Sequence, residues 1–401
     1  MRVFQLNMVC GIKSTGRIAS EIGKLVEADG GECRIGCGAN FVSPESEHFA
    51  VKTISVTGRR IYSLLTKLFD AEGRWNRIGT RRLLRQMEQF QPDVVHLHNI
   101  HGCYLHAGEL FRYLKKKNLP VVWTLHDCWP FTGHCAYFDY SGCERWKTAC
   151  HDCPQLKSYP VCVGLDGSRR NHAWKRKLFT SLDNLTMVVP CQWMAGPLGQ
   201  SYMQNCPVRT IYNGVDLQAF RPVDSDIRQR FGLEKGKLVL AVASDWDERK
   251  GLRYLIQAAE KMGEEYRFVV IGLSKEQVES LPQGMIGIEH TANVGELVQW
   301  YSAADCLANP SMEDNMPMVN LEALACGTPI ATFRTGGCPE AVDADTGIVV
   351  DKADVDGLCE AIRQLCPKTE ERKAACLKRA QLFDSRRTFE NYLNLYKELC
   401  R

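Results

Sequence analysis

Acidic side chains gather in one short stretch, residues 311–329, around the start of a helical pattern. Two acids, Glu313 and Asp314, precede the pattern, and a third, Glu322, lies within it. A helix that begins near Pro317 directs its free N–H groups and the positive end of its dipole at the acidic loop. The N–H groups suit phosphates and the carboxylates suit hydroxyls, so the stretch is suited to a nucleotide-sugar. Taken alone, the simpler interpretation is an ordinary amphipathic helix.

Two adjacent cations, Arg249 and Lys250, stand between a strand pattern and the helical pattern 252–261. Cations at the start of a helix oppose its dipole, so a purely structural role is less natural for them. A bound diphosphate would be stabilised by both charges. The pair therefore predicts an anion site at the carboxyl end of that strand.

Imidazole groups are concentrated at the ends of two strand patterns in the first half of the chain. His98 and His101 follow one pattern, and His126, with Asp127 beside it, follows the next. A histidine there can donate to a phosphate or a sugar hydroxyl while the carboxylate orients the ring. A hydrogen-bonded structural histidine is the default interpretation of any one of them, but their density favours a functional role.

A cysteine-rich insertion at residues 128–160 lacks an apolar core pattern of its own. Four thiols in it can close a tetrahedral zinc site that would tie down such a loop. His134 or His151 could replace one thiol, and the alternative is a loop of reduced, partly buried thiols. The candidate metal ligands are Cys135, Cys143, Cys150 and Cys153.

Length and composition restrict the class of protein. A chain of 401 residues fits two domains, and no apolar run approaches the ~20 residues of a membrane span. The first six residues are too short and unflanked for a signal peptide and predict a buried strand. The 19 cysteines are odd in number and scattered from Cys10 to Cys400, which argues against a secreted disulfide framework and for reducing cytoplasm.

The net charge of +3 hides an asymmetry between the two halves. Residues 1–215 hold 27 Lys and Arg against 17 Asp and Glu, or +10, which leaves 23 against 30, or −7, for the remainder. A basic first half attracts anionic lipid or a phosphate-linked substrate, although solvated helix faces explain it equally well. Nucleic acid is not expected as a partner, because the basic clusters lack interleaved aromatic platforms and any DNA-reading motif.

Strand and helix patterns alternate along both halves, which predicts parallel, doubly wound sheets. Ligands of such sheets lie at the carboxyl ends of the strands. We expect an α/β protein of two Rossmann-like domains facing a cleft, residues 1–215 and 216–385, and a C-terminal helix in 386–401 that packs on the first domain. The expected strands are 2–6, 32–37, 50–55, 94–98, 121–125 and 187–189, then 237–242, 266–271, 286–289, 306–309 and 329–332.

Together these motifs resemble glycosyltransferase family 4, whose members are retaining enzymes of the GT-B fold. The resemblance rests on residues 213–216 (Asn-Gly-Val-Asp), 249–251 (Arg-Lys-Gly), and Asp314 placed eight residues before Glu322. It covers essentially the whole chain. Within the family it is closest to the capsular and exopolysaccharide branch, through residues 96–102 (His-Leu-His-Asn-Ile-His-Gly) and 123–130 (Trp-Thr-Leu-His-Asp-Cys-Trp-Pro).

The resemblance implies roles for individual residues. Glu322 matches the acid expected on the nucleotide ribose, and Lys250 matches the diphosphate-binding lysine. The acid expected on the donor sugar falls at Asp314 or Glu313. His126 matches the histidine near the transferred sugar, and His98, His101 and Asp127 would lie on the acceptor side. Ser244 replaces a family arginine, part of whose work Arg249 would take over. Gly16 matches a loop glycine, and Asn315 and Met316 complete the donor-binding set.

The resulting hypothesis is a retaining glycosyltransferase of the hexosyltransferase type, without a catalytic metal, that acts in surface polysaccharide synthesis. Its partners would be a nucleotide diphosphate sugar and a saccharide or lipid-linked saccharide acceptor, at the cytoplasmic face of an anionic membrane. Two alternatives remain open: a nucleotide-sugar epimerase on the same fold, and a saccharide-binding module without catalysis.

Overall fold

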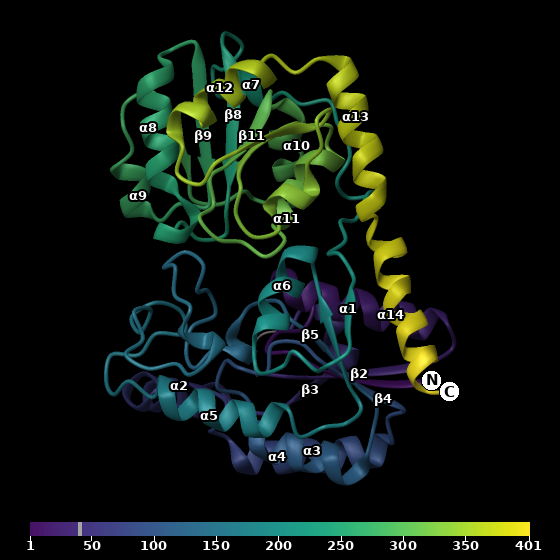
Figure 1. Ribbon diagram of the computed structural model, residues 1–401. Helices are drawn as coiled ribbons and strands as arrows, with labels where there is room; N and C mark the ends of the chain where they lie inside the picture. Colours follow the sequence, from purple (N-terminus) through teal and green to yellow (C-terminus); the bar gives the residue numbers. More distant parts are fainter. Residues whose placement is uncertain (39–41) are drawn as a thin grey trace. The chain divides into compact units, whose positions relative to one another are not determined.

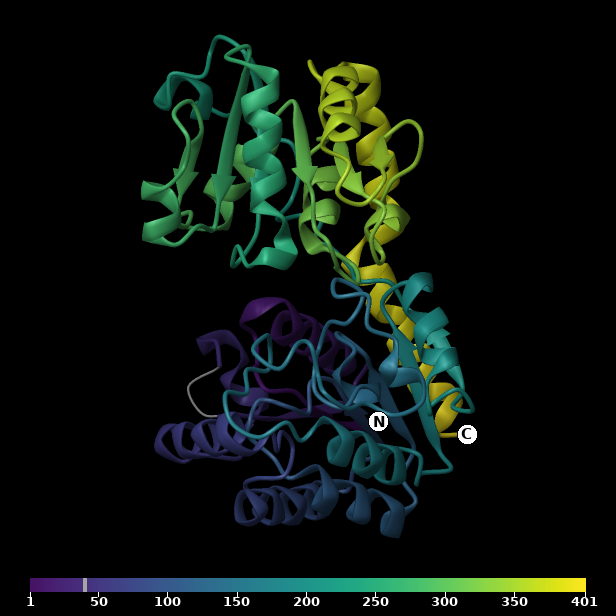
Figure 2. The same cartoon turned by 60° about the vertical axis from the view of Figure 1, so that its left-hand side comes forward.

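The computed structural model describes residues 1–38 and 42–401, which divide into two compact units. The first unit comprises residues 1–212 and 388–401, and the second comprises 213–387. The sequence-based division fell at residues 215 and 385. Each unit is described by itself, and Figures 1 and 2 show the elements of both.

The first unit is built on a parallel sheet with the strand order β3-β2-β1-β4-β5-β6-β7. The order reverses direction between β1 and β4, as in doubly wound folds. Its strands are β1 (Arg2–Leu6), β2 (Glu32–Cys37), β3 (Ala50–Lys52), β4 (Val94–Leu97), β5 (Val121–Thr124), β6 (Leu185–Val189) and β7 (Val208–Thr210).

Helices cover both faces of this sheet, with α3, α4 and α5 together on one face in Figures 1 and 2. The helices of the unit are α1 (Lys13–Ala28), α2 (Val56–Phe69), α3 (Arg77–Phe90), α4 (Ala107–Lys117), α5 (Ser168–Phe179) and α6 (Gln192–Gln200), and most of α14 (Ser385–Leu399). Residues 128–167, which contain the cysteine-rich insertion, form only the short 3-10 turns Trp129–Phe131 and Arg145–Lys147.

The C-terminal helix α14 belongs to the core of the first unit. Phe389, Tyr392 and Tyr396 of α14 pack in one buried cluster with residues of α1 and of the sheet. The packing has a polar component, since the Tyr396 hydroxyl lies 2.6 Å from Nδ1 of His96. Residues 388–401 are therefore grouped with the first unit.

The second unit repeats the same topology with the order β10-β9-β8-β11-β12-β13. Its strands are β8 (Lys237–Val242), β9 (Tyr266–Ile271), β10 (Ile286–Ile288), β11 (Cys306–Asn309), β12 (Ile330–Phe333) and β13 (Gly347–Val350). Its helices are α7 (Ile227–Arg230), α8 (Leu252–Met262), α9 (Lys275–Glu279), α10 (Val294–Ala303), α11 (Met318–Ala325), α12 (Val355–Leu365) and α13 (Glu370–Ala380).

The predicted fold class is confirmed. The structure differs from the expected elements at the end of one strand and in two short strands that were not expected. The expected strand 50–55 stops at Lys52, because Ser55 caps α2, its side chain accepting a hydrogen bond from the Gly58 N–H. The strands β7 and β13 were not predicted, since each is short and only partly buried. No described helix combines the length and apolarity needed to cross a membrane.

Candidate functional site

The topology of the second unit brings the two predicted donor loops together. Strands β8 and β11 are neighbours at the point where the strand order reverses, so the loops after them meet at one edge of the sheet. There Nζ of Lys250 lies 2.5 Å from Oδ2 of Asp314, and both side chains are less than one-fifth exposed. Residues 64 positions apart thus form one ion pair.

Backbone contacts hold these two loops in register. Gly251 has a φ of +78°, and a Cβ there would lie 2.2 Å from the Pro310 carbonyl oxygen, so this close approach requires glycine. The Met312 N–H donates to the Arg249 carbonyl at 2.7 Å. In return, Nη1 of Arg249 donates to the carbonyl oxygen of Glu313 at 2.7 Å. The cation pair is therefore fixed against the acidic loop.

A third loop closes on Asp314 from the other side. The Gly337 N–H donates to the Asp314 carbonyl at 3.0 Å. Gly336 has a φ of +51°, and a Cβ there would stand 1.8 Å from the same carbonyl. Any side chain at Gly336 would displace the loop that carries the acid.

The two candidate first acids lie in different environments. Glu313 is completely buried, and its backbone carbonyl contacts Arg249. Asp314 is partly exposed and directs its carboxylate at Lys250. Of the two, only Asp314 offers a carboxylate that a ligand at this edge could reach.

Glu322 is held by a tyrosine that the sequence analysis did not identify. Glu322 lies in α11, and its Oε2 accepts a hydrogen bond of 2.9 Å from the hydroxyl of Tyr301 in α10. Burial, together with the Glu322 carboxylate, raises the pKa of the Tyr301 hydroxyl, which therefore stays a donor. The ordinary helical spacing of Tyr301 gave no signal of this contact.

A buried network of hydrogen-bonded amide side chains supports the acidic loop. Asn309 Nδ2 donates to Oδ1 of Asn320, and the Ser311 hydroxyl donates to Oδ1 of Asn309 at 2.7 Å. The neighbouring loop residues Asn315 and Met316 are also buried, and the Met316 carbonyl accepts from Asn213 at 3.2 Å.

Two further predicted donor residues, Ser244 and Gly16, belong to different units. Ser244 is exposed in the loop after β8 and shares that loop with Lys250. Gly16 lies in α1 of the first unit, where a Cβ would stand 2.9 Å from the Val9 side chain. Gly16 therefore acts locally, by letting the first turns of α1 pack on the loop after β1.

In the first unit, buried His98 and partly buried His126 belong to one hydrogen-bonded chain. Nδ1 of His98 lies 2.9 Å from Nε2 of His126, and Nε2 of His98 lies 2.9 Å from Oε1 of Gln5. Burial lowers the pKa of His98 well below its usual value and that of His126 to about 4. Both rings are therefore neutral at pH 7, as a hydrogen bond shared between two ring nitrogens requires. The participation of Gln5 was not anticipated.

His101 and Asp127 form a separate ion pair. His101 Nε2 lies 2.8 Å from Oδ2 of Asp127, and the Tyr159 hydroxyl lies 3.1 Å from its Nδ1. Burial alone would lower the pKa of His101, but the charge and hydrogen bond of Asp127 outweigh it and raise this pKa. Burial alone would raise the pKa of Asp127, yet its partner His101 lowers it. The predicted acceptor-side residues thus belong to two pairs: His98 contacts His126, and His101 contacts Asp127.

His101 also lines a cavity of about 350 Å³ in the first unit. Three cations, Lys13, Arg59 and Lys67, line the same cavity, together with one acid, Glu72. Glu72 is oriented by the backbone, since its Oε1 accepts from the N–H groups of Gly102 and Cys103. The cavity can therefore take a polar ligand that carries negative charge.

The four candidate zinc thiols border one small cavity, together with His134. As they stand, the described residues hold no group of three or more His, Cys, Asp or Glu side chains that could hold a metal ion. The donor chemistry fits zinc nevertheless, because Nδ1 of His134 is tied to Asp70 at 2.6 Å while its buried Nε2 has no hydrogen-bond partner. Zinc binding would require the thiols to close in, and it stays a prediction.

Comparison with known proteins gives two family matches. Residues 17–219 match the model described as Glycosyltransferase Family 4, and residues 236–367 match the model described as Glycosyl transferases group 1. The two matches fall on the first and second sheets respectively. They cover the histidine chain and the Lys250–Asp314 pair.

Among named relatives, the chain is 28% identical over 325 residues to WcaC of Escherichia coli K12, a proposed colanic acid biosynthesis glycosyl transferase. The alignment covers 77% of each chain. It is 33% identical over 215 residues to the D-inositol 3-phosphate glycosyltransferase of Saccharomonospora viridis, which covers 48% of this chain and 50% of that protein.

Solved structures share the fold at low sequence identity. Sucrose-phosphate synthase from Thermosynechococcus elongatus has a TM-score of 0.73 at 17% identity, covering 99% of this chain and 98% of that one. The Anabaena protein Alr3699/HepE, solved in complex with UDP-glucose, has a TM-score of 0.66 at 14% identity, covering 99% and 100%. Both support the GT-B arrangement of two parallel-sheet units.

Proposed function

We propose, from the premise that this chain belongs to glycosyltransferase family 4, that it moves a sugar with retention of configuration from a nucleotide diphosphate sugar to a saccharide acceptor. The observation that carries the proposal is the Lys250–Asp314 pair at the carboxyl edge of the second sheet. A cation and a carboxylate at that edge match the two ends of such a donor, its diphosphate and its sugar hydroxyls.

The ion pair suggests how the donor would enter. The donor diphosphate would draw Lys250 away from Asp314, and the freed carboxylate would then accept hydrogen bonds from the sugar hydroxyls. Glu322, oriented by Tyr301, would accept from the ribose hydroxyls. Asp314 and Glu322 would thus bind different parts of the donor, the sugar and the ribose.

Charge development on the leaving group is where the protein can accelerate the reaction. When the bond between the anomeric carbon and the diphosphate oxygen breaks, negative charge accumulates on the diphosphate. Lys250, Arg249 and the free N–H groups at the start of α11 would stabilise that charge, as fixed dipoles and cations do in a preorganised site. No step in this scheme assigns work to a divalent metal.

In the first unit, neutral His126 would serve the transferred sugar as a hydrogen-bonding group. His98 shares a hydrogen bond with Nε2 of His126, which fixes the orientation of the His126 ring. The cavity beside His101, with its three cations, would take the acceptor. A saccharide carried on a phosphorylated lipid at the cytoplasmic face of the membrane fits those cations, and the relationship to WcaC supports a role in surface polysaccharide synthesis.

The decisive experiment is incubation of the purified chain with a panel of nucleotide-sugars and saccharide acceptors, with release of the nucleotide diphosphate measured. UDP-sugars are tested first, because a structural neighbour was solved with UDP-glucose. We expect release with one donor and a product whose anomeric configuration, measured by NMR, matches that of the donor. Isomerisation without release would favour an epimerase, and donor binding without turnover would favour a binding module.

A further inference from the structure

The helix α2 of the first unit exposes an apolar ridge that no described element covers. Ile61, Leu64, Leu68 and Phe69 have exposed fractions of 53%, 59%, 40% and 44%, and Thr66 is the one buried residue of the helix. The spacing of three, four and one residues places these side chains along one side of the helix. An ordinary surface helix turns such a stripe toward the core.

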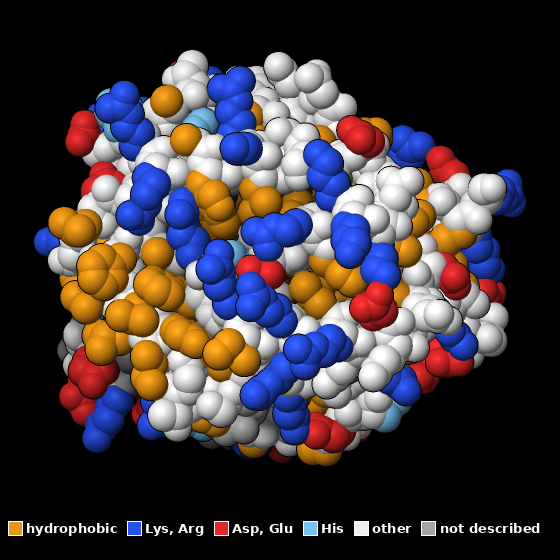
Figure 3. All heavy atoms as spheres, turned by 90° about the horizontal axis from the view of Figure 1, so that it is seen from below, with side chains coloured by type: hydrophobic (Ala, Val, Ile, Leu, Met, Phe, Trp, Pro, Cys, Tyr) orange, Lys and Arg blue, Asp and Glu red, His pale blue; other side chains and the backbone are white. Residues whose placement is uncertain are grey.

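A second segment extends the ridge. The Val163 N–H donates to the Lys67 carbonyl and the Leu165 N–H to the Leu68 carbonyl, each at 2.9 Å. Val163 and Leu165 are themselves 68% and 67% exposed. The six apolar side chains form one surface, named here the α2 ridge: Ile61, Leu64, Leu68, Phe69, Val163 and Leu165. Figure 3 shows an area of hydrophobic side chains on this face of the first unit.

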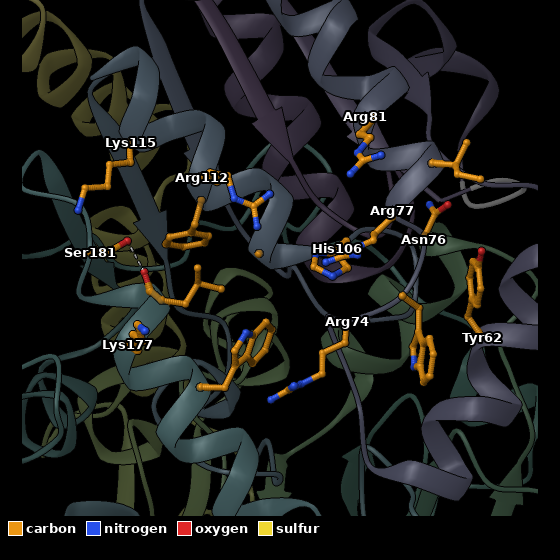
Figure 4. A pocket seen from close by; sticks show the side chains of 16 residues that line it. Tyr62, Arg74, Asn76, Arg77, Arg81, His106, Arg112, Lys115, Lys177 and Ser181 are labelled. Atoms are coloured by element: carbon orange, nitrogen blue, oxygen red, sulfur yellow. Dashed lines mark hydrogen bonds between the residues drawn. The ribbon is translucent and has the colours of Figure 1, made fainter.

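A basic groove of about 1040 Å³ lies next to the ridge. Its walls come from α2, α3, α4, α5 and the loop before α3, and no acid is among its lining residues. Figure 3 shows Lys and Arg side chains around a hollow with hydrophobic side chains inside it, and Figure 4 shows the lining side chains. The cations of the groove are Arg74, Arg77, Arg81, Arg112, Lys115 and Lys177.

One buried carboxylate organises half of these cations. Glu109, next to the groove, forms ion pairs with Arg77, Arg81 and Arg112. The distances from the guanidinium nitrogens to the carboxylate oxygens are 3.5, 3.3 and 3.1 Å. Three positive charges share one negative charge, so the cluster remains positive. Its guanidinium groups are 60–66% exposed and can still meet an external anion.

The other three cations of the groove have no ion pair among the described residues. Arg74 stacks 4.2 Å above the ring of Trp174, and its buried Nε and Nη2 have no hydrogen-bond partner. Burial and the nearby Arg170 lower the pKa of Arg74 to about 10, so it is still charged at pH 7. Lys115 and Lys177 are exposed at the rim.

The ridge and the groove are joined through α2 itself. Tyr62 of α2 lines the groove and stacks on Trp75, with the ring centroids 6.2 Å apart. On another side of α2, Arg59 and Lys67 line the cavity that contains His101. One helix therefore separates the proposed acceptor cavity from the basic groove and carries the apolar ridge.

We propose that this face docks the first unit on a bilayer that contains anionic phospholipid, with the α2 ridge in the interfacial layer and headgroup phosphates in the basic groove. An apolar ridge beside an anion-accepting groove matches the two components of such a surface, acyl chains and phosphates. Nucleic acid would use the cations but leaves the exposed leucines and valines without a partner. If the proposed transfer also holds, a lipid-linked acceptor in that bilayer would meet its cavity at the side of α2.

The test is co-sedimentation of the full chain with phosphatidylcholine vesicles, with and without 30 mol% phosphatidylglycerol (roughly the proportion at which an anionic surface potential attracts basic segments). We expect binding to the anionic vesicles only, weakened at least tenfold when salt is raised from about 50 to 500 mM. Leu64→Gln and the double variant K115E/K177E should each weaken it about tenfold or more. All three positions are exposed, so their substitution leaves the core unchanged.

Matched controls lie in the second unit. Leu382, 49% exposed, is changed to Gln for comparison with Leu64, and K275E/K378E reverses the same number of exposed charges. We expect the controls to bind like the unchanged chain. Absence of binding to anionic vesicles at low salt, equal binding to neutral vesicles, or equal losses in variants and controls would overturn the proposal. Release of the nucleotide diphosphate from the donor, with a soluble saccharide acceptor present, is measured in parallel, and its absence with vesicle binding intact would contradict the transfer alone.

Discussion

The Lys250–Asp314 pair of the second unit is charged, and the His98–His126 pair of the first unit is neutral. In the second unit, Lys250 and Asp314 meet as a partly exposed ion pair at a loop edge. In the first unit, His98 is buried and His126 partly buried, both are neutral, and they share one hydrogen bond. The pair in the second unit can exchange partners with a charged ligand, whereas the histidine chain can offer only a fixed neutral ring. Under the proposed function, the second unit would bind the donor diphosphate, and the neutral histidines of the first unit would contribute hydrogen bonds to hydroxyls.

The largest effect should come from removing the cation of the exposed pair. Lys250→Ala should lower turnover roughly 100- to 1,000-fold, because one preorganised contact to developing charge is worth about 3–4 kcal/mol. Steady-state kinetics of nucleotide diphosphate release measure the effect. Lys261→Ala is the control, since Lys261 pairs with Asp356 elsewhere on the same unit. Turnover that survives Lys250→Ala would remove the diphosphate from this pair.

The second effect separates the two adjacent acids. Asp314→Asn should reduce turnover about 100-fold, because the amide cannot pair with Lys250 or accept hydroxyl protons equally well. Glu313→Gln should leave the donor affinity of the folded enzyme nearly unchanged, since its side chain is completely buried. Kinetics and the unfolding midpoint are measured for both variants. The opposite ranking of the two variants in turnover would make Glu313 the donor-sugar acid.

The third test concerns the cysteine-rich insertion, where a zinc ion would bind the four candidate thiols of the first unit. Elemental analysis should find about one zinc per chain, and its removal by a chelator should lower the unfolding temperature, because metal binding is linked to folding. Cys135→Ser and Cys153→Ser should lose the metal, while Cys206→Ser, outside the insertion, should retain it. A chain without zinc and with all four thiols free to titrate would reject the site.

The neutral histidines predict a pH dependence of stability. Burial lowers the pKa of His96, His98 and His126 below the ordinary histidine value of 6.5. Their contribution is complete above pH 6.5 and is lost as the pH falls toward the folded pKa values, by up to ~1.4 kcal/mol per pH unit for each ring. His101, whose pKa is raised, acts in the opposite direction. Unfolding midpoints between pH 7.5 and 5 measure the slope, and His126→Asn should reduce it. A flat profile would mean that these rings are charged or exposed.

The smallest effect concerns the tyrosine that orients Glu322. Tyr301→Phe removes one hydrogen bond to a carboxylate, worth ~1.5–3 kcal/mol in favourable cases and less where water can replace it. We expect the KM for the donor to rise several-fold with kcat nearly unchanged, because the ribose contact exists before and during the reaction. Tyr266→Phe is the control, because Tyr266 is the first residue of β9 and its hydroxyl contacts Lys237 instead of Glu322. An unchanged KM would separate Glu322 from ribose binding.

Local patterns in the sequence were sufficient for the elements that lie at the centre of each sheet. Strands β1, β2, β8, β9 and β11 begin and end where the sequence patterns predict, because an inner parallel strand is covered on both faces and most of its residues are apolar. The edge strands β7 and β13 were missed, since partial burial leaves no such run.

For the site, the sequence alone identified the candidate residues: the cations 249 and 250, the acids near α11 and the histidines after β4 and β5. Only the tertiary structure decided how they combine. It buries Glu313 and presents Asp314 to Lys250, and it adds Tyr301 and Gln5 as partners. The physical reason is that these contacts join residues 21 to 93 positions apart, and strand order, rather than local spacing, determines which segments meet.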